Sequence, residues 1–232
     1  MGLENLLHRL LLKFEPEKAH AIAKRAMLLK LFAPGRFRTK ESVTELFGVE
    51  LDNPFGIAAG FDKYAVLHSA AQDYGFGWIE EGSFTYRGGD GNDKPRLFRL
   101  EDGSMLNRMG LNNCGSSEAF NIFCELENEN FFGVNITKTH DPEIVGKKAI
   151  DDIIGSFCLL RSFGIYTAIN VSCPNTSEGK TFEESDSFDK LNTALRKEGK
   201  VRPLVYKFSP RLEREKLRNL VEISRDFADG YE

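Results

Sequence analysis

Apolar residues near the start of the chain recur at helical spacing. Residues 3–13 carry an apolar stripe, and residues 17–32 repeat the pattern. Because positions three and four apart lie on the same side of an α-helix, this spacing predicts two short amphipathic helices. Pro34 and Gly35 interrupt the pattern, so residues 32–37 are predicted to link these helices to the rest of the chain. The first stripe consists of Leu3, Leu6, Leu7, Leu10 and Leu11.

Downstream of the linker, short β-leaning apolar runs alternate with longer helix-compatible segments. This alternation predicts an α/β fold with a parallel sheet. The last three predicted helices end in glycine, as the C-termini of helices often do. The predicted strands are residues 55–60, 77–83, 131–137, 166–172 and 203–209, and the predicted helices are residues 63–75, 150–164, 188–199 and 214–230.

Polar side chains gather where the predicted strands end. A GxGxxG dinucleotide motif is absent, because neither residues 55–60 nor residues 88–92 have its spacing. Polar residues after successive parallel strands are typical of the active face of a (β/α)₈ barrel, which is the fold we expect. These residues are Lys63, Ser83, Asn135, the segment 170–175 and Lys207.

Composition and charge narrow the class of protein. The chain has 232 residues, of which 41% are hydrophobic and 28% charged, and its net charge of −4 argues against a nucleic-acid binder. Residues 1–40 nevertheless hold nine Lys or Arg and only three Glu. No apolar run reaches the ~18 residues of a membrane span, and Glu4 with no small-residue cleavage site argues against a secretory signal.

The four cysteines do not have metal-ligand spacing. They lack a CxxC motif and a histidine at zinc-ligand distance, so we predict reduced thiols and no metal site. The residues are Cys114, Cys124, Cys158 and Cys173.

The segment INVSCPNTS (169–177) places Cys173 at the end of a predicted strand, directly before a proline that cannot continue a ladder. A thiol at that rim can accept a proton where its surroundings favour the thiolate. Asn170 and Asn175 supply neutral amides that suit a planar, carbonyl-rich ligand. The alternative is a small cysteine that only fills the rim.

Two other segments have candidate chemistry. AAGFDKYA (58–65) joins small residues, which let a flat ring approach the backbone, to Lys63, which can face an anion. A plain surface lysine is the alternative. MLNRMGLNNCG (105–115) has no helical or strand pattern and is too apolar for a free loop, so we expect it to fold over a pocket.

Seven ordered motifs then carry a resemblance, and they cover nearly the whole chain. Together they resemble the dihydroorotate dehydrogenase family, and FEPEKAHAIAKR (14–25) resembles the helical extension of its membrane-associated, quinone-reducing class two branch. The resemblance implies a (β/α)₈ TIM-type barrel at residues 41–232, after a helical extension at residues 1–40 for quinone and membrane. The motifs are NPFGIAAGFDK (53–63), GFGWIEEGS (75–83), GNDKPRLFRL (91–100), NRMGLNN (107–113), GVNITK (133–138), INVSCPNT (169–176) and LVYKFSP (204–210).

The resemblance also implies the ligands and their residues. It implies FMN as cofactor, dihydroorotate and orotate as substrate and product, and a quinone as acceptor, in pyrimidine biosynthesis. Cys173 takes the position of the base that removes a proton from C5 of dihydroorotate as hydride leaves C6. The implied FMN residues are Ala59, Gly60, Lys63, Ser83, Asn107, Asn135, Asn170 and Lys207; the substrate residues are Lys63, Asn107, Arg108, Met109, Gly110, Leu111, Asn170, Asn175 and Thr176; and the quinone residues are His20, Ala23 and Arg99.

Several positions depart from the family pattern. Class two members carry serine at the Cys173 position, and Thr137 and Thr139 replace the usual glycine and asparagine. Tyr64 replaces a small polar residue, and residues 80–89 lack the usual proline-rich loop.

Length is the largest departure from the family. A (β/α)₈ barrel takes about 250 residues, and the chain ends where the sixth strand of the family would begin. We therefore expect a C-terminally truncated, incomplete barrel of about five to six strands that holds FMN poorly. The alternatives are a non-catalytic remnant and another FMN barrel oxidoreductase acting on pyrimidines. By its basic, apolar helices we expect a peripheral protein on the cytoplasmic face of a bacterial-type membrane, although a helical hairpin that caps the barrel would look the same.

Overall fold

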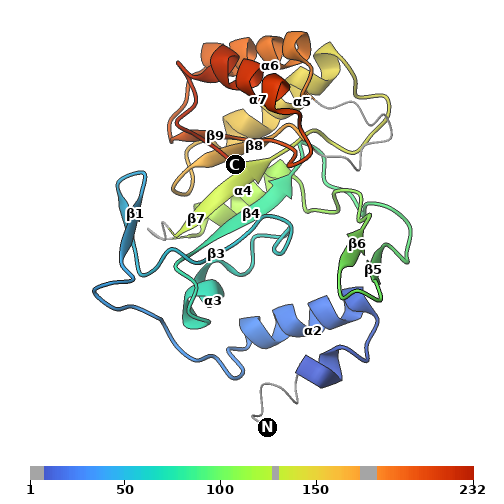
Figure 1. Ribbon diagram of the computed structural model, residues 1–232, viewed down its shortest axis with the longest axis vertical. Helices are drawn as coiled ribbons and strands as arrows, with labels where there is room; N and C mark the ends of the chain where they lie inside the picture. The colour runs from blue at the N-terminus through green and yellow to red at the C-terminus, as the bar shows by residue number, and fades with distance from the viewer. Residues whose placement is uncertain (1–7, 127–130, 173–181) are drawn as a thin grey trace.

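A six-stranded parallel sheet forms the centre of the computed structural model, which describes residues 8–126, 131–172 and 182–232 (Figure 1). The strand order is β10-β9-β8-β7-β4-β3, and every neighbouring pair is parallel. The sheet curls as part of a barrel, which confirms the expected incomplete TIM-type fold. The strands are β3 Gly56–Ile57, β4 Trp78–Phe84, β7 Phe132–Ile136, β8 Thr167–Asn170, β9 Leu204–Lys207 and β10 Gly230–Tyr231.

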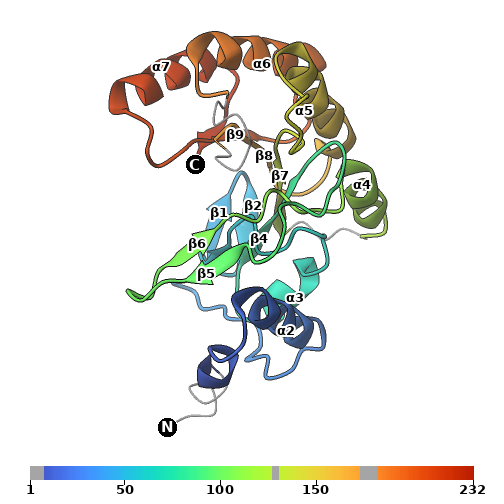
Figure 2. The same cartoon turned by 90° about the vertical axis from the view of Figure 1, so that its right-hand side faces the viewer.

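Helices cover the outer face of this sheet, as Figure 2 shows for the arc from α4 to α7. Each helix follows a strand and returns the chain to the next parallel strand, which is the connection that parallel pairing requires. The main apolar core fills the layer between helices and strands. The helices are α3 His68–Asp73, α4 Ser116–Cys124, α5 Lys147–Leu160, α6 Ser185–Glu198 and α7 Arg214–Ser224.

The first strand and the first barrel helix are shorter than predicted. β3 has only two residues, because the chain turns away through Gly60 at φ 98°. Helix α3 begins at His68 and not at residue 63, because the buried carboxylate of Asp62 accepts hydrogen bonds from the backbone N–H groups of Val66 and Leu67. Asp62 thereby holds a turn where a helix was expected.

Sequence patterns missed helix α4 and two hairpins, β1 Thr44–Leu46 with β2 Val49–Leu51 and β5 Leu97–Arg99 with β6 Met105–Asn107. The expectation that residues 105–115 contain no strand is therefore wrong at Met105–Asn107. All three residues of β6 are exposed, so no alternation of apolar and polar positions marks the strand.

The prediction that the last helices end in glycine is confirmed for one of the two helices described next and wrong for the other. Gly199 caps the end of α6 at φ 71°, as predicted. Gly230 does not end a helix, because α7 stops at Ser224 and Gly230 begins β10. The backbone N–H of Asp229 donates to the carbonyl of Leu204, which draws the chain back into the sheet.

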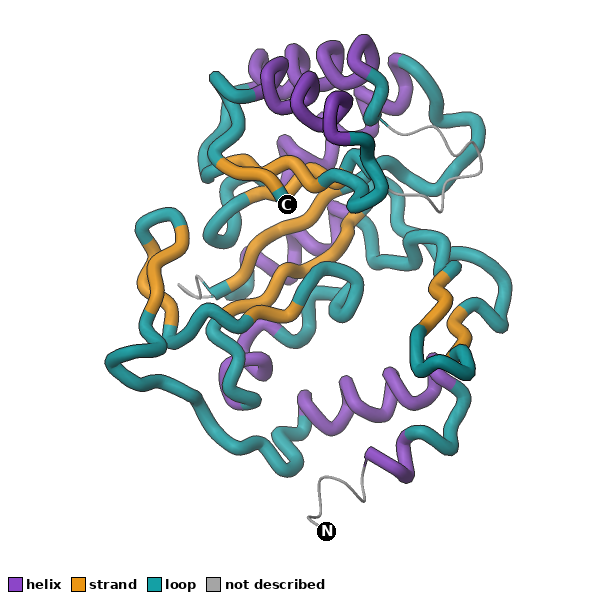
Figure 3. Tube along the Cα trace, in the orientation of Figure 1, coloured by secondary structure: helices purple, strands orange, loops and turns teal. Residues whose placement is uncertain are grey.

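The N-terminal region consists of α2 Pro16–Leu28 and a short helical stretch at residues 8–11. The carboxylate of Glu15 caps α2 by accepting from the N–H groups of Glu17 and Lys18. Figure 3 shows α2 away from the sheet. Helix α2 contacts α3 and β5. In the part of the chain that the structure describes, no helix is both long enough and apolar enough to cross a bilayer.

Candidate functional site

The carboxyl ends of the strands bring several of the predicted site residues together. Asn170 on β8 lies opposite Lys207 on β9. The loop after β3 is tied to the end of β4, because Gly60 N–H donates to Gly82 O at 2.7 Å and Gly82 N–H donates to Asp62 O at 2.8 Å. The predicted gathering of Lys63, Ser83, Asn135, Asn170 and Lys207 around one end of the sheet follows from this parallel register.

A buried carboxylate on β4 joins these strands, and the sequence reasoning missed it. Glu80 is 1% exposed and accepts hydrogen bonds from Asn135 Nδ2 at 2.8 Å and Tyr166 Oη at 2.7 Å. Lys207 Nζ lies 3.3 Å from Glu80 Oε1. Two adjacent glutamates, Glu80 and Glu81, inside an otherwise uncharged predicted strand could have indicated it. A carboxylate buried in a strand requires hydrogen-bond donors from neighbouring residues.

Asn135 leaves one polar atom for a ligand. Its side chain is fully buried, and its Nδ2 is taken by Glu80. Its Oδ1 finds no hydrogen-bond partner among the described residues. Such a carbonyl suits a planar group with a ring N–H donor. Gly60 adds space, because a Cβ there would meet no atom within 4 Å. These residues fit the ring of a flavin.

A cavity of about 890 Å³ lies between α2 and the loops beside the barrel. Lys63 and Met109 line it together with residues of α2, so it adjoins the loop after β3. The wall residues include Glu17, His20, Lys24, Phe61, Tyr64, Asn92, Arg96 and Asn112.

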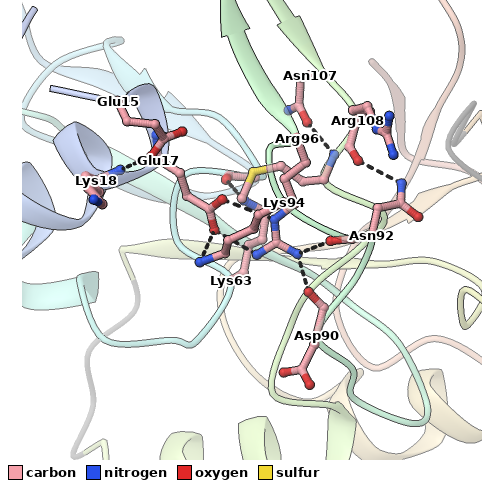
Figure 4. A network of polar contacts seen from close by, with 12 residues as sticks. Glu15, Glu17, Lys18, Lys63, Asp90, Asn92, Lys94, Arg96, Asn107 and Arg108 are labelled. Atoms are coloured by element: carbon pink, nitrogen blue, oxygen red, sulfur yellow. Dashed lines mark hydrogen bonds and ion pairs between the residues drawn. The ribbon is translucent and has the colours of Figure 1, made fainter.

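A partly buried ion pair fastens α2 across this cavity (Figure 4). Arg96 donates to both carboxylate oxygens of Glu17, with Nη2 at 2.7 Å and Nε at 3.2 Å, and Lys94 lies 3.3 Å from the same carboxylate. The hydrogen bond from Arg96 lowers the pKa of Glu17 despite the opposing effect of burial. Arg96 also donates to the carbonyls of Asp90 and Asn92, so one guanidinium holds both the helix and the loop.

Lys63 lines the cavity without a salt bridge to a carboxylate among the described residues. Its ammonium donates to Gly60 O and contacts Met109 Sδ at 3.6 Å. Burial, and then the nearby charges of Lys24 and Arg96, lower its pKa to about 8. A lysine of this kind can respond to an anionic ligand with a change in charge.

Two contacts tie α2 to the segment before Lys63. His20 Nε2 lies 3.1 Å from Phe61 O, and Lys24 Nζ donates to Asp62 Oδ1 at 2.8 Å. Burial, followed by the charges of Lys63 and Lys24, lowers the pKa of His20. Of the three predicted quinone residues, only His20 lines the cavity. Ala23 is half-buried on the same helix.

Arg99 lies apart from the cavity wall. It is exposed and donates to the carbonyls of Leu12 and Phe14. It therefore holds the chain ahead of α2, and does not line the cavity in this structure.

The loop after β6 is only partly turned inward. Met109 and Gly110 are buried, whereas Asn107 and Arg108 are exposed. Asn107 Oδ1 accepts from the N–H of Met109, so its side chain shapes the loop. Leu111 has φ 56°, and it turns the chain toward the buried amides that follow.

Among the remaining predicted positions, Ala59 is half-buried and Ser83 is buried at the carboxyl ends of their strands. Asn170 Oδ1 accepts from Ser172 N and Oγ. The predicted catalytic Cys173 and the predicted substrate residues Asn175 and Thr176 lie outside the described residues. At the two replaced positions, Thr137 Oγ1 donates to Asn170 O, and Thr139 binds the buried carboxylate of Asp152.

A curled parallel sheet with helices outside and polar groups at the carboxyl ends of its strands defines a barrel of the TIM class. A family profile described as dihydroorotate dehydrogenase matches residues 42–227. The chain belongs to the dihydroorotate dehydrogenase family.

Individual relatives agree with this assignment. The chain is 36% identical to the dihydroorotate dehydrogenase (quinone) of Thermus thermophilus, over 94% of this chain and 66% of that protein. It is 34% identical to the protein of the same name from Christiangramia forsetii, over 96% of this chain and 69% of that one. The crystal structure of DHODH from Eimeria tenella in complex with ferulenol superimposes with a TM-score of 0.81 at 28% identity, covering 94% of this chain and 66% of that one. The chain thus spans about two thirds of the length of these relatives.

Proposed function

We propose that this chain oxidises (S)-dihydroorotate to orotate in pyrimidine biosynthesis, with FMN as cofactor and a quinone as electron acceptor. Family membership supports the reaction, and the name of the relatives supports the acceptor. The observation that carries the proposal is the cavity of about 890 Å³ between α2 and the loop that presents Lys63. One lysine there can face both an acceptor under α2 and a cofactor at the ends of the strands.

FMN would supply reversible two-electron transfer when bound. The residues proposed to hold its ring are Asn135, through the Oδ1 that has no hydrogen-bond partner among the described residues, and Lys207, with Gly60 leaving room for close approach. Asn170 and Lys63 would orient the substrate beside it, because amides and an ammonium suit a carbonyl-rich anion. Holding both molecules in fixed geometry removes much of the entropic barrier to their reaction. Ala59, Ser83, Asn107 to Leu111, Asn175 and Thr176 complete the proposed cofactor and substrate set.

The proposed acceptor site lies under α2. His20 lines the cavity with an imidazole held on Phe61 O, and Ala23 lies on the same helix. The exposed side chains of Leu10, Leu12 and Phe14 offer an apolar face that fits peripheral contact with the cytoplasmic side of a membrane. We accordingly assign residues 1–40 to acceptor and membrane contact and residues 41–232 to the barrel.

Flavin absorbance of the purified protein tests the proposal first. Anaerobic dihydroorotate should bleach this absorbance, and a soluble quinone should restore it. Protein that remains colourless after incubation with FMN, or flavin that dihydroorotate leaves unbleached, would contradict the proposed reaction. His20→Ala should slow restoration by quinone and leave bleaching by dihydroorotate unchanged, with the exposed His8→Ala as its control.

The proposed base is tested by the pH dependence of bleaching. A thiol loses its proton at lower pH than a hydroxyl, so Cys173→Ser should move the pH–rate profile in the alkaline direction. A profile of unchanged position would remove Cys173 from the role of base.

A further inference from the structure

The carboxylate of Glu80 lies where the proposed flavin-contacting side chains meet, yet it is not itself one of them. Asn135 Nδ2, Tyr166 Oη and Lys207 Nζ converge on it at 2.8, 2.7 and 3.3 Å. These donors come from β7, from the residue before β8 and from β9, and Glu80 lies on β4. One side chain therefore connects four neighbouring strands of the sheet.

This carboxylate decides which end of the Asn135 amide is available. A carboxylate only accepts hydrogen bonds, so the amide must turn its Nδ2 toward Glu80 and its Oδ1 away. That Oδ1 is the buried atom without a partner among the described residues. A neutral glutamine at position 80 could donate instead of accept, which would allow the Asn135 amide to flip and present a donor.

The same carboxylate acts on Lys207. Burial lowers the pKa of Lys207, but the charges of Glu80 and Glu232 and their contacts with the ammonium outweigh this and raise the pKa overall. Among the described residues, the ionisable groups around Lys207 are Glu80 from β4, Glu232 after β10 and, through Glu80, the phenol of Tyr166. Burial, followed by the negative charge of Glu80, raises the pKa of Tyr166, so its hydroxyl remains a donor at neutral pH.

The packing around Glu80 holds this arrangement in place. Tyr166 reaches Glu80 by crossing Gly133, where an added Cβ would lie 2.4 Å from Tyr166 Cζ. Glu80 and Asn135 are 1% and 0% exposed, so water does not compete for their hydrogen bonds.

We propose that Glu80 is a positioning residue that fixes the Asn135 carbonyl and the Lys207 ammonium in the orientations with which they contact the bound cofactor. The proposal rests on the proposed function for the identity of that cofactor. The contacts of Glu80 with Asn135 and Lys207 are present in the protein without ligand, so this part of the proposal can be tested without the cofactor.

The test compares Glu80→Gln with Glu81→Gln. Both are isosteric changes of a buried carboxylate on β4, and Glu81 is its neighbour on the opposite face of the strand. In protein without flavin, NMR of ¹³C-labelled lysine should show that the pKa of Lys207 falls in Glu80→Gln and is unchanged in Glu81→Gln. The side-chain N–H₂ of Asn135 should exchange slowly in the wild type and in Glu81→Gln, and faster in Glu80→Gln.

FMN titration by fluorescence quenching supplies the second measurement. Loss of a hydrogen bond to a charged group costs enough to weaken FMN binding by Glu80→Gln about tenfold or more, with Glu81→Gln within about twofold of the wild type. Unchanged Lys207 titration and Asn135 exchange in Glu80→Gln would overturn the proposal. So would FMN affinity equal to the wild type in a Glu80→Gln protein whose Lys207 pKa has fallen.

The two proposals fail in different ways. Wild-type protein that takes up no FMN contradicts the proposed function, and the NMR measurements on that same protein still decide whether Glu80 holds Asn135 and Lys207. Wild-type protein that binds FMN while Glu80→Gln matches it in every measurement leaves the function standing and removes Glu80 from its positioning role.

Discussion

Strand β4 buries two adjacent carboxylates on opposite faces, and the two faces differ in what they offer. Glu80 points into the barrel interior, where Asn135, Tyr166 and Lys207 donate to it. Glu81 is fully buried toward the helix layer, and neither of its oxygens has a hydrogen bond within the described ranges. An ionisable neighbour is His68 of α3, with Nδ1 3.6 Å from Oε1.

Comparing these two carboxylates separates the cost of burying a carboxylate from the effect of the hydrogen-bond donors around it. Burial raises the pKa of Glu81 to about 7, with His68 and Lys24 opposing the rise and the charge of Asp62 adding to it. Glu80 is as buried as Glu81, but its donors are those that a carboxylate requires. The interior face therefore supplies hydrogen-bond donors to its carboxylate, whereas the outer face buries a carboxyl group whose pKa is raised to about 7.

Removing the interior carboxylate is expected to have the largest effect on stability. Glu80→Leu has a similar size but removes the acceptor of Asn135 Nδ2 and Tyr166 Oη and deprives Lys207 of one of the two acidic neighbours that it has among the described residues. Breaking a buried, hydrogen-bonded charge pair costs about 3–5 kcal/mol, and urea denaturation should show a loss of this size. Glu222→Gln, which removes an ion pair with exposed Arg225, should cost less than about 0.5 kcal/mol. A loss for Glu80→Leu as small as that control would mean that the interior donors find other partners.

Replacing the outer carboxylate, Glu81, is expected to stabilise the protein, which is the opposite of the effect expected at Glu80. The folded-state pKa of Glu81 is raised from 4.5 to about 7, so its contribution to stability is fully present below pH 4.5 and is lost as pH rises through about 7. Glu81→Gln removes the ionisation and should stabilise the protein by about 3 kcal/mol at pH 8 and by about 1 kcal/mol at pH 5.

Urea titrations of both proteins at pH 5 and pH 8 measure this difference. A stability gain that is equal at the two pH values would show that Glu81 does not titrate in this range. A loss at pH 8 would show that its anion is stabilised by His68 more strongly than burial penalises it.

The order of strands and helices could be predicted from the sequence, because each element follows from the spacing of apolar residues within it. The buried residues of β7 form a continuous apolar run interrupted only by Asn135, and that run fixes both the strand and the position of the polar residue. Once parallel strands are inferred, their carboxyl ends must lie together, and Asn135, Asn170 and Lys207 follow.

The cavity could not be predicted in the same way, because its contacts join distant parts of the chain. Glu17 and Arg96 are 79 positions apart, and His20 and Phe61 are 41 apart. No spacing rule indicates such pairs. Likewise, the pattern of β4 marks Glu80 and Glu81 as unusual, but only the positions of Tyr166 and His68 decide which of the two carboxylates has donors.

The smallest of the expected effects concerns the route by which Tyr166 reaches Glu80. In Gly133→Ala the added Cβ would lie 2.4 Å from Tyr166 Cζ, so the ring must shift and its hydroxyl must move away from the carboxylate. Overpacking of this kind costs about 1–3 kcal/mol. Gly89→Ala is the matched control, because a Cβ there meets nothing within 4 Å. A double-mutant cycle with Tyr166→Phe should show that the two changes are not additive, since both weaken the same contact. Additive losses would mean that Gly133 is needed for packing alone and does not act through the contact between Tyr166 and Glu80.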